Sequence, residues 1–249
     1  MEIKAIGNTP GNYKISLKLY VDLTSSLQAE TVEKLEIRKT GDNDLMNTYK
    51  LDIVSSKIVI YENETCTQTR KLKTQVIYYE REITLDPLQY NDPKGYYLIW
   101  NSCCRNAGIV NILSPALTEL HFKTSFPPLI KSGKLFLDSS PSFSELDGAY
   151  MCIGEPFYFS FDATDADGDE LKYTMQDLLG RMGASISYVK WANGYSATNA
   201  IPGSPALNID AKTGELYVVP NQLGLFVFSV VVEEFRDGQL IGLSAATIS

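Results

Sequence analysis

The chain has 249 residues, of which 44% are hydrophobic, and a formal net charge of −8 at pH 7. This length is enough for one large domain or two ordinary ones with a substantial core. The negative charge argues against nucleic-acid binding, because phosphate recognition needs clustered lysine and arginine, and it suits a solvated or cation-binding surface. No apolar run has the length of a membrane-spanning helix, and residues 1–30 lack the regions of a signal peptide. If the protein is secreted, we therefore expect this chain to be a mature fragment.

Apolar and polar residues alternate with a period of two in three segments, which is typical of half-buried strands. These segments are 13–21, 157–161 and 226–232. Further β-rich runs, separated by turn residues, cover about 57–61, 73–85, 95–101, 118–123, 170–175, 186–191, 206–210, 214–219 and 239–248. Only 27–39 and 176–184 could form a turn or two of helix. Short strands at this spacing, without alternating helices, predict an all-β chain built of antiparallel sandwiches.

The strand pattern lapses between about 125 and 150. This stretch contains Pro127-Pro128 and the run Ser139-Ser140-Pro141-Ser142. Such a composition is typical of a connection between domains. We therefore expect a first β-sandwich over 1–125, a connection over 126–150 and a second β-sandwich over 151–249.

The four cysteines fit two disulfides and so an oxidising compartment. Cys103 and Cys104 follow an apolar run, and neighbours on a strand point to opposite faces, so we expect them to have different partners. Spacing favours a bond from Cys66 to one of the pair and another that joins this half to Cys152, which would limit motion between the domains. The alternatives are four free thiols in a cytosolic protein and a zinc site. Zinc is disfavoured because C-x2-C spacing is missing and the one histidine, His121, has no nearby ligand partner.

Carboxylates are concentrated between two expected strands, where four aspartates fall within eight residues. They are Asp162, Asp165, Asp167 and Asp169. Such charges repel one another unless they are solvated or bridged by a cation, and hard oxygen ligands suit calcium. The spacing is not that of an EF-hand, and a tight hairpin turn at Asp167-Gly168 with solvated aspartates is the alternative. The residues that could complete a metal site are Glu155, Glu233 and Glu234.

The sequence holds no catalytic constellation, so we predict no enzyme activity. His121 is the only candidate base for a triad, and it lies between apolar strand residues. Glu233 and Glu234 are adjacent on a strand and so cannot flank one glycosidic bond. The adjacent cysteines lack the C-x-x-C spacing of a redox site. Carbohydrate recognition is a further hypothesis, since aromatic residues could stack on sugar rings; the candidates are Trp191, Tyr195 and the pair Tyr96-Tyr97.

Several separated segments resemble the ectodomain modules of Bacteroidetes cell-surface proteins of the gliding-motility adhesin type, which the type IX system exports. The segments are YKISLKLYVD (13–22), GYYLIWNSCCRNAGIVNI (95–112), CIGEPFYFSFDATDADGDELKY (152–173), WANGY (191–195), IPGSPALNIDAKTGELYVVP (201–220) and VVVEEFRDGQLIG (230–242). The second half also is similar to bacterial cadherin-like and other immunoglobulin-like repeats. In these, an Asp-x-Asp-Gly-Asp strand precedes an Ile-Asp-x-x-Thr-Gly turn.

The resemblance implies two tandem immunoglobulin-like antiparallel β-sandwiches. It implies a calcium role for Asp165, Asp167 and Asp169, and a turn role for Asp210 and Gly214. The function it implies is that of a non-catalytic extracellular module of a cell-surface adhesin, involved in adhesion and gliding motility and stabilised by calcium. The expected partners are an extracellular surface or glycan, or neighbouring modules of the same protein, with no nucleic acid and no membrane insertion. A carbohydrate-binding module is the alternative, and a secreted hydrolase is a more remote one.

Overall fold

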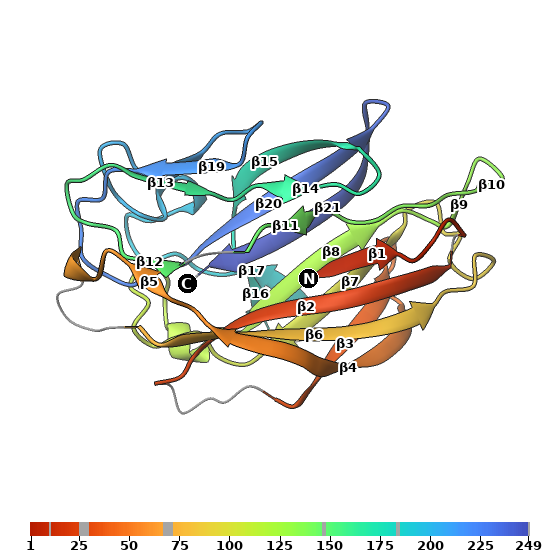
Figure 1. The fold of residues 1–249 in the computed structure, drawn as a ribbon, viewed down its shortest axis with the longest axis horizontal. Coiled ribbons are helices and arrows are strands. Elements are labelled where there is room, and N and C mark those ends of the chain that lie inside the picture. The colour runs from red at the N-terminus through yellow and green to blue at the C-terminus, as the bar shows by residue number, and fades with distance from the viewer. Residues whose placement is uncertain (10, 25–29, 67–71, 146–147, 183–184, 249) are drawn as a thin grey trace.

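The computed structural model describes residues 1–9, 11–24, 30–66, 72–145, 148–182 and 185–248, and these form an all-β structure (Figure 1). Within these ranges there is no α-helix, only the short 3-10 helices η1 (Glu64–Cys66), η2 (Pro115–Leu117) and η3 (Ala197–Asn199). No helix of the described residues is long and apolar enough to cross a membrane. The predicted all-β class is confirmed.

Ten strands form one antiparallel sheet, which draws on both halves of the chain. In sheet order they are β1 (Glu2–Ala5), β2 (Asn12–Asp22), β6 (Thr74–Thr84), β4 (Leu45–Ile58), β3 (Val32–Lys39), β7 (Tyr96–Ser102), β8 (Leu120–Phe126), β21 (Gln239–Ile248), β20 (Phe228–Arg236) and β15 (Glu170–Gln176). The two halves meet where Leu243 and Ser244 of β21 pair with Ser125 and Thr124 of β8. One sheet therefore contains strands of both segments that the sequence assigned to separate sandwiches. Two independent immunoglobulin-like domains are not confirmed.

The remaining strands are shorter and form five small sheets beside the large one (Figure 1). Those of the first half and the connection are β5 (Tyr61–Glu62), β9 (Ile130–Lys131), β10 (Lys134–Leu135), β11 (Ser142–Phe143) and β12 (Gly148–Ala149). Those of the second half are β13 (Phe157–Ser160), β14 (Ala163–Thr164), β16 (Leu179–Met182), β17 (Ser185–Tyr188), β18 (Asn208–Ile209) and β19 (Glu215–Val218). Of the two segments considered as helices, 27–39 contains β3 and 176–184 contains β16. Residues 27–29 and 183–184 lie outside the described residues.

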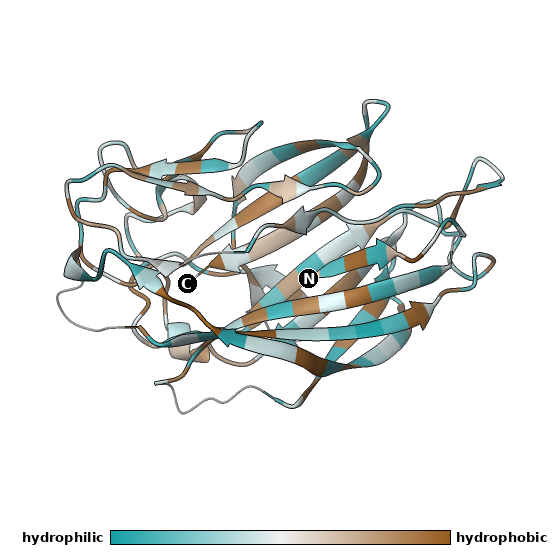
Figure 2. Cartoon of the chain, viewed as in Figure 1, coloured by the Kyte–Doolittle hydropathy of each residue, from teal (hydrophilic) through white to brown (hydrophobic). Residues whose placement is uncertain are grey.

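Hydrophobic and hydrophilic residues alternate along several strands (Figure 2), and in a strand this alternation places side chains in turn on the two faces. In β2, Tyr13, Ile15 and Leu17 are buried on one face and belong to the core of the first half. Strand β7 is buried on both faces, from Tyr96 to Trp100, which explains its unbroken apolar run. A second core forms around residues of β15, β19 and β20, and a small third one packs between loops of both halves.

The connection is held against both halves. Ser140 exchanges hydrogen bonds with Ile3 of β1, from its amide to the carbonyl at 2.8 Å and from the Ile3 amide to its Oγ at 2.9 Å. Further along, Glu145 is paired with Lys57 of β4 and accepts a hydrogen bond from Tyr78 of β6. Strand β11 then pairs with β14 of the second half, and β12 pairs in parallel with β5 of the first. Because β11 pairs with the second half and β12 pairs with the first, this segment links the two halves.

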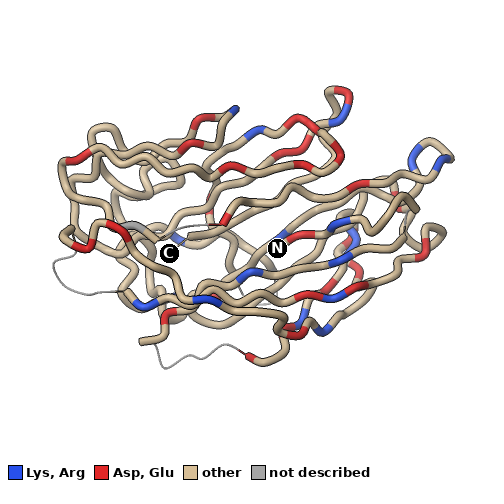
Figure 3. Tube along the Cα trace, viewed as in Figure 1, with Lys and Arg blue, Asp and Glu red and all other residues tan. Residues whose placement is uncertain are grey.

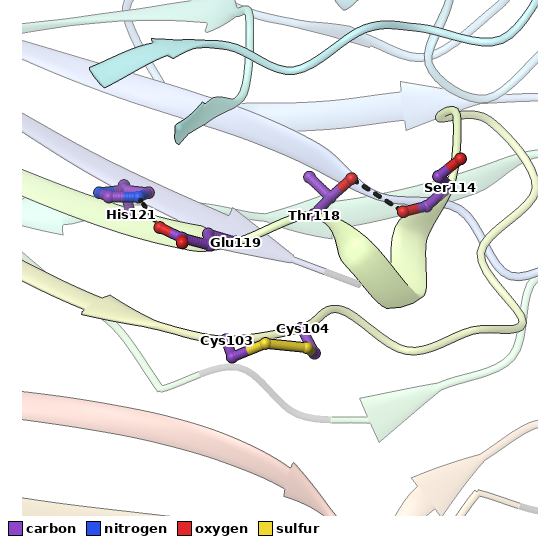
Figure 4. Close-up of a disulfide and its surroundings, with 6 residues drawn as sticks. All are labelled: Cys103, Cys104, Ser114, Thr118, Glu119 and His121. Carbon is purple, nitrogen blue, oxygen red and sulfur yellow. Dashed lines mark hydrogen bonds and ion pairs between the residues drawn. A yellow bond between two sulfur atoms is a disulfide. The ribbon is translucent and has the colours of Figure 1, made fainter. Parts of the chain in front are cut away.

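All four cysteines are in disulfides, but the pairing differs from the expectation. Cys66 is bonded to Cys152, so a bond from the first half to Cys152 is present as expected. Cys103 is bonded to its neighbour Cys104 (Figure 4). The prediction of different partners for the adjacent cysteines was wrong because β7 ends at Ser102 and Cys104 has a φ of 73°. The pair therefore lies beyond the strand, where the rule of alternating faces does not apply.

We expect the two disulfides to differ in their contribution to stability. The Cys66–Cys152 bond spans 86 residues, and closing a loop of this size lowers the conformational entropy of the unfolded chain by an amount worth about 4.6 kcal/mol. Replacing both cysteines by serine should lower the melting temperature by roughly 10 °C. Serine at both Cys103 and Cys104 is the matched control and should cost far less, because that bond closes no long loop. Equal losses in calorimetry, or peptide mapping that links Cys66 to Cys103 or Cys104, would contradict this pairing.

The continuous sheet predicts that the two halves unfold together. The chain has two tryptophans, Trp100 in the core of the first half and Trp191 against the second and third cores. In the single-tryptophan variants Trp100→Phe and Trp191→Phe, urea unfolding followed by fluorescence should therefore coincide with unfolding followed by circular dichroism. Two separate transitions in either variant would show that the halves are independent domains.

Candidate metal centre

Three segments that are distant in the sequence bring five carboxylates together. Asp138 comes from the connection, and Glu234 comes from β20. The loop between β14 and β15 supplies the others, Asp165, Asp167 and Asp169. Figure 3 shows acidic residues gathered in this part of the second half, beside the hairpin that joins β20 to β21. The structure thus brings together the three predicted aspartates and Glu234, one of the residues expected to complete a site, and it adds Asp138.

The loop is shaped by its own first aspartate. Oδ1 of Asp165 accepts the amide N–H groups of Asp167 and Asp169, both at 2.9 Å. Gly168 has a φ of 84°, which favours glycine and closes the turn. The tight turn that the sequence offered as an alternative to calcium is therefore present. It also aims the carboxylates of the loop toward one another, so the turn and a cation site are compatible.

The carboxylates form two groups that share one member. Ligand oxygens of Asp165, Asp167 and Asp169 lie within 4.8 Å of one another, and so do those of Asp138, Asp169 and Glu234. The first group is partly exposed, whereas Asp138 and Glu234 are 4% and 0% exposed. The second group is therefore the drier one, where electrostatic interactions are stronger.

Arg236 provides a positive charge on one side of the cluster. Its Nε donates to Oδ1 of Asp169 at 2.7 Å, and its Nη2 donates to Oδ1 of Asp138 at 2.7 Å. Nη2 also contacts the second oxygen of Asp169, and Nη1 donates to the Leu137 carbonyl at 3.0 Å. These carboxylates raise the pKa of Arg236 above its ordinary value, Asp169 foremost. The guanidinium of Arg236 thus bonds to two of the five acidic side chains, Asp138 and Asp169.

Glu234 has no such partner. It is fully buried, and neither of its oxygens accepts a hydrogen bond within the described part of the chain. Burial, reinforced by Asp138, Asp165 and the neighbouring Asp169 carboxylate, raises the pKa of Glu234 to about 10. The residue opposite it on β21 is Gly242, where a Cβ atom would collide with the Glu234 carboxylate. The missing side chain at Gly242 therefore leaves the room that the carboxylate occupies.

Two more carboxylate oxygens of the cluster lack a hydrogen-bond donor among the described residues, Oδ2 of Asp138 and Oδ2 of Asp165. Burial raises the pKa of Asp138 to about 7, against the opposing effect of Arg236. The hydroxyl of Tyr13 is buried and also without a partner there, and its pKa is raised by burial and then by Asp138 and Asp167. The centre is thus rich in oxygen atoms and poor in donors, as a hard cation requires.

The other acidic candidates lie elsewhere. Glu233 faces away from Glu234, opposite Lys172 of β15. Glu155 follows Cys152 in a turn where its amide donates to the Cys152 carbonyl at 3.3 Å. Asp162 accepts hydrogen bonds from Ser160 and Ser144, which lower its pKa.

The expected turn of the second half has the geometry that the resemblance implies. Oδ1 of Asp210 accepts the amides of Lys212 at 2.9 Å and Thr213 at 2.8 Å. Gly214 has a φ of 74°, and its amide donates to the Asp210 carbonyl at 3.0 Å. Asp210 therefore closes a turn before β19.

Glu234 was named from the sequence only as one of three residues that could complete a metal site, and its place in β20 gives a stronger signal. On β20 the buried positions Phe228, Val230 and Val232 recur with a period of two, and Glu234 is the next member of that series. An acidic residue in a buried register needs a compensating partner. Asp138 carried no comparable signal, because its burial depends on how the connection packs.

The aromatic candidates are placed differently from one another. Trp191 packs against the cores and donates from Nε1 to Asp177 at 2.8 Å. Tyr195 is partly exposed and its hydroxyl donates to Gln222 at 3.0 Å. Tyr96 and Tyr97 are 0% and 1% exposed and so cannot stack on a sugar. A role of Trp191 and Tyr195 in ligand binding stays a prediction.

His121 lies on β8 with its ring buried. Its Nε2 is 3.0 Å from a carboxylate oxygen of Glu119, as Figure 4 shows together with the Cys103–Cys104 disulfide nearby. The contact gives one ring nitrogen a partner at 5% exposure, whereas Nδ1 has none among the described residues.

Comparison with known proteins identifies no family for this chain. No protein-family model matches it, and no curated protein sequence is significantly similar to it. The likeness to adhesin modules therefore depends on the segments quoted above, and the function must be argued from the geometry of the chain itself.

Proposed function

We propose that this chain is a non-catalytic extracellular module of a cell-surface adhesin of the Bacteroidetes gliding-motility type. The observation that carries the proposal is the construction of the molecule, in which a continuous sheet, a docked connection and the Cys66–Cys152 bond join both halves. A module that holds a surface in place must keep its shape under load, and this construction resists separation of the halves.

The cysteine chemistry supports an extracellular location. All four cysteines are paired, and no free thiol remains. Disulfides of this kind persist in oxidising environments and are rare in the cytosol. The acidic surface fits an environment rich in divalent cations, and calcium held by Asp165, Asp167 and Asp169 is part of the proposal.

We propose the architecture expected from the resemblance in a modified form. Separate cores in the first and second halves support two tandem immunoglobulin-like sandwiches over 1–125 and 151–249. The shared sheet makes them one mechanical unit. The partners we propose are an extracellular surface or glycan and neighbouring modules of the same protein.

Adhesion can be tested with beads coated with the purified chain. We expect the coated beads to be retained on glass or polysaccharide surfaces under flow more strongly than beads coated with an unrelated protein of similar size and charge. Reduction and alkylation of the four cysteines should remove the excess retention. Equal retention of both kinds of bead would contradict the adhesive function, and hydrolysis of esters or glycosides that is lost on His121→Ala would contradict the absence of catalysis.

Carbohydrate binding is a second candidate because of one exposed aromatic pair that the sequence did not reveal. Tyr158 of β13 and Tyr217 of β19 lie opposite each other with ring centroids 4.6 Å apart, and Tyr158 is 60% exposed. Asn208 of β18 is the next residue across the same face. Aromatic rings beside an amide are a common surface for sugar stacking and hydrogen bonding.

A glycan array distinguishes this candidate from the first. If the pair binds sugar, Tyr158→Ala should abolish array binding. Tyr188→Ala is the matched control, since Tyr188 is also 60% exposed but lies on β17. Absence of glycan binding, or equal loss in both variants, would reject the lectin function.

A further inference from the structure

Glu234 is the feature of the acidic cluster that a solvated hairpin does not explain. Solvated aspartates need no partner, whereas a carboxylate with 0% exposure and no hydrogen-bond donor among the described residues is out of contact with water. Leaving such a group uncompensated is costly. Glu234 therefore points to a ligand independently of the aspartate loop.

Several oxygen atoms of the cluster are bonded neither to Arg236 nor to any other donor among the described residues. Arg236 occupies both oxygens of Asp169 and one oxygen of Asp138. The other oxygen of Asp138, one of Asp165 and both of Glu234 have no donor among the described residues. These four oxygens, with the shared carboxylate of Asp169, are hard ligands of the kind and number that calcium takes, with water completing the coordination.

We propose that a divalent cation, calcium by its chemistry, binds among Asp138, Asp169 and Glu234, with Asp165 as a further ligand. The site is deeper than the loop site implied by the resemblance, and it deepens the calcium stabilisation of the proposed function, on which it rests. The buried site takes the place of the loop site, and Asp167, a ligand of the loop site, is not a ligand here. Its Oδ2 instead accepts the amide of Ser139 at 2.7 Å and so holds the connection beside the site.

The cation would act on a part of the molecule outside the second half. Asp138 belongs to the connection, and the next two residues hold strand β1. Ser139 accepts the Ala5 amide at 3.2 Å, and Ser140 exchanges hydrogen bonds with Ile3. An ion bound by Asp138 and Glu234 therefore fixes the connection to β20, and through the connection it fixes β1. Occupancy of the site controls whether β1 and residues 136–140 are protected from exchange.

The test uses the full chain stripped with EDTA and titrated with calcium and, separately, with terbium. We expect saturable binding of one calcium ion, a higher melting temperature, and terbium emission excited through nearby tyrosine and displaced by calcium. Hydrogen exchange should slow in residues 1–6 and 134–142 when calcium is added. A chain that shows no terbium emission and no calcium binding would overturn the proposal without reference to any variant.

Isosteric variants locate the site. Glu234→Gln and Asp138→Asn should each weaken calcium binding at least tenfold and abolish the slowed exchange. Glu233→Gln removes the same charge from the neighbouring position on the opposite face and should bind calcium as the unmodified chain does. Binding that survives in Glu234→Gln but is lost in Asp167→Asn would place the ion in the loop and reject the buried site. Bead retention is scored separately, so calcium binding without adhesion would reject the adhesive function alone.

Discussion

The pairing of β8 with β21 is the contact on which the rest of the arrangement depends. It spans only two residue pairs, and the residues at its centre, Thr124 and Ser244, are both fully buried. So short a pairing needs reinforcement, which comes from the connection and from the disulfide at Cys152. The halves are thus held together in two places, by the pairing of β8 with β21 and by the contacts of the connection with both halves.

The acidic cluster depends on that arrangement. Glu234 and Arg236 are two residues apart on β20. Glu234 has no hydrogen-bond donor among the described residues, whereas Arg236 bonds to two carboxylates. Asp138 reaches them only because the connection crosses the second half at this point. Because the acidic residues come from the connection, a loop and a strand, the site forms only when all three are packed together. Cation binding there would therefore depend on the packing of both halves.

Much of the fold could be predicted from the sequence, but some strands could not. Strands with a buried face, such as β2 and β20, show clear alternation and were predicted. Strand β4 was largely missed because it has only one buried residue, Leu51, in 14, and the polar β3 was confused with a helix. The loop aspartates were identified, whereas Asp138 was missed because its burial arises from contacts between distant segments. The prediction of the cysteine pairing was wrong because β7 ends before the two cysteines, so the alternation of faces along a strand does not apply to them.

The Cys66–Cys152 bond also sets how far the molecule can be stretched. Strands β6, β7 and β8 all lie between the two cysteines, whose separation is 86 residues. Tension applied at the two ends of the chain passes through the sulfur bridge and leaves this segment slack. Fully extended, a segment of this length would span about 300 Å. That length stays hidden while the bridge is intact, and reduction of a single covalent bond would release it.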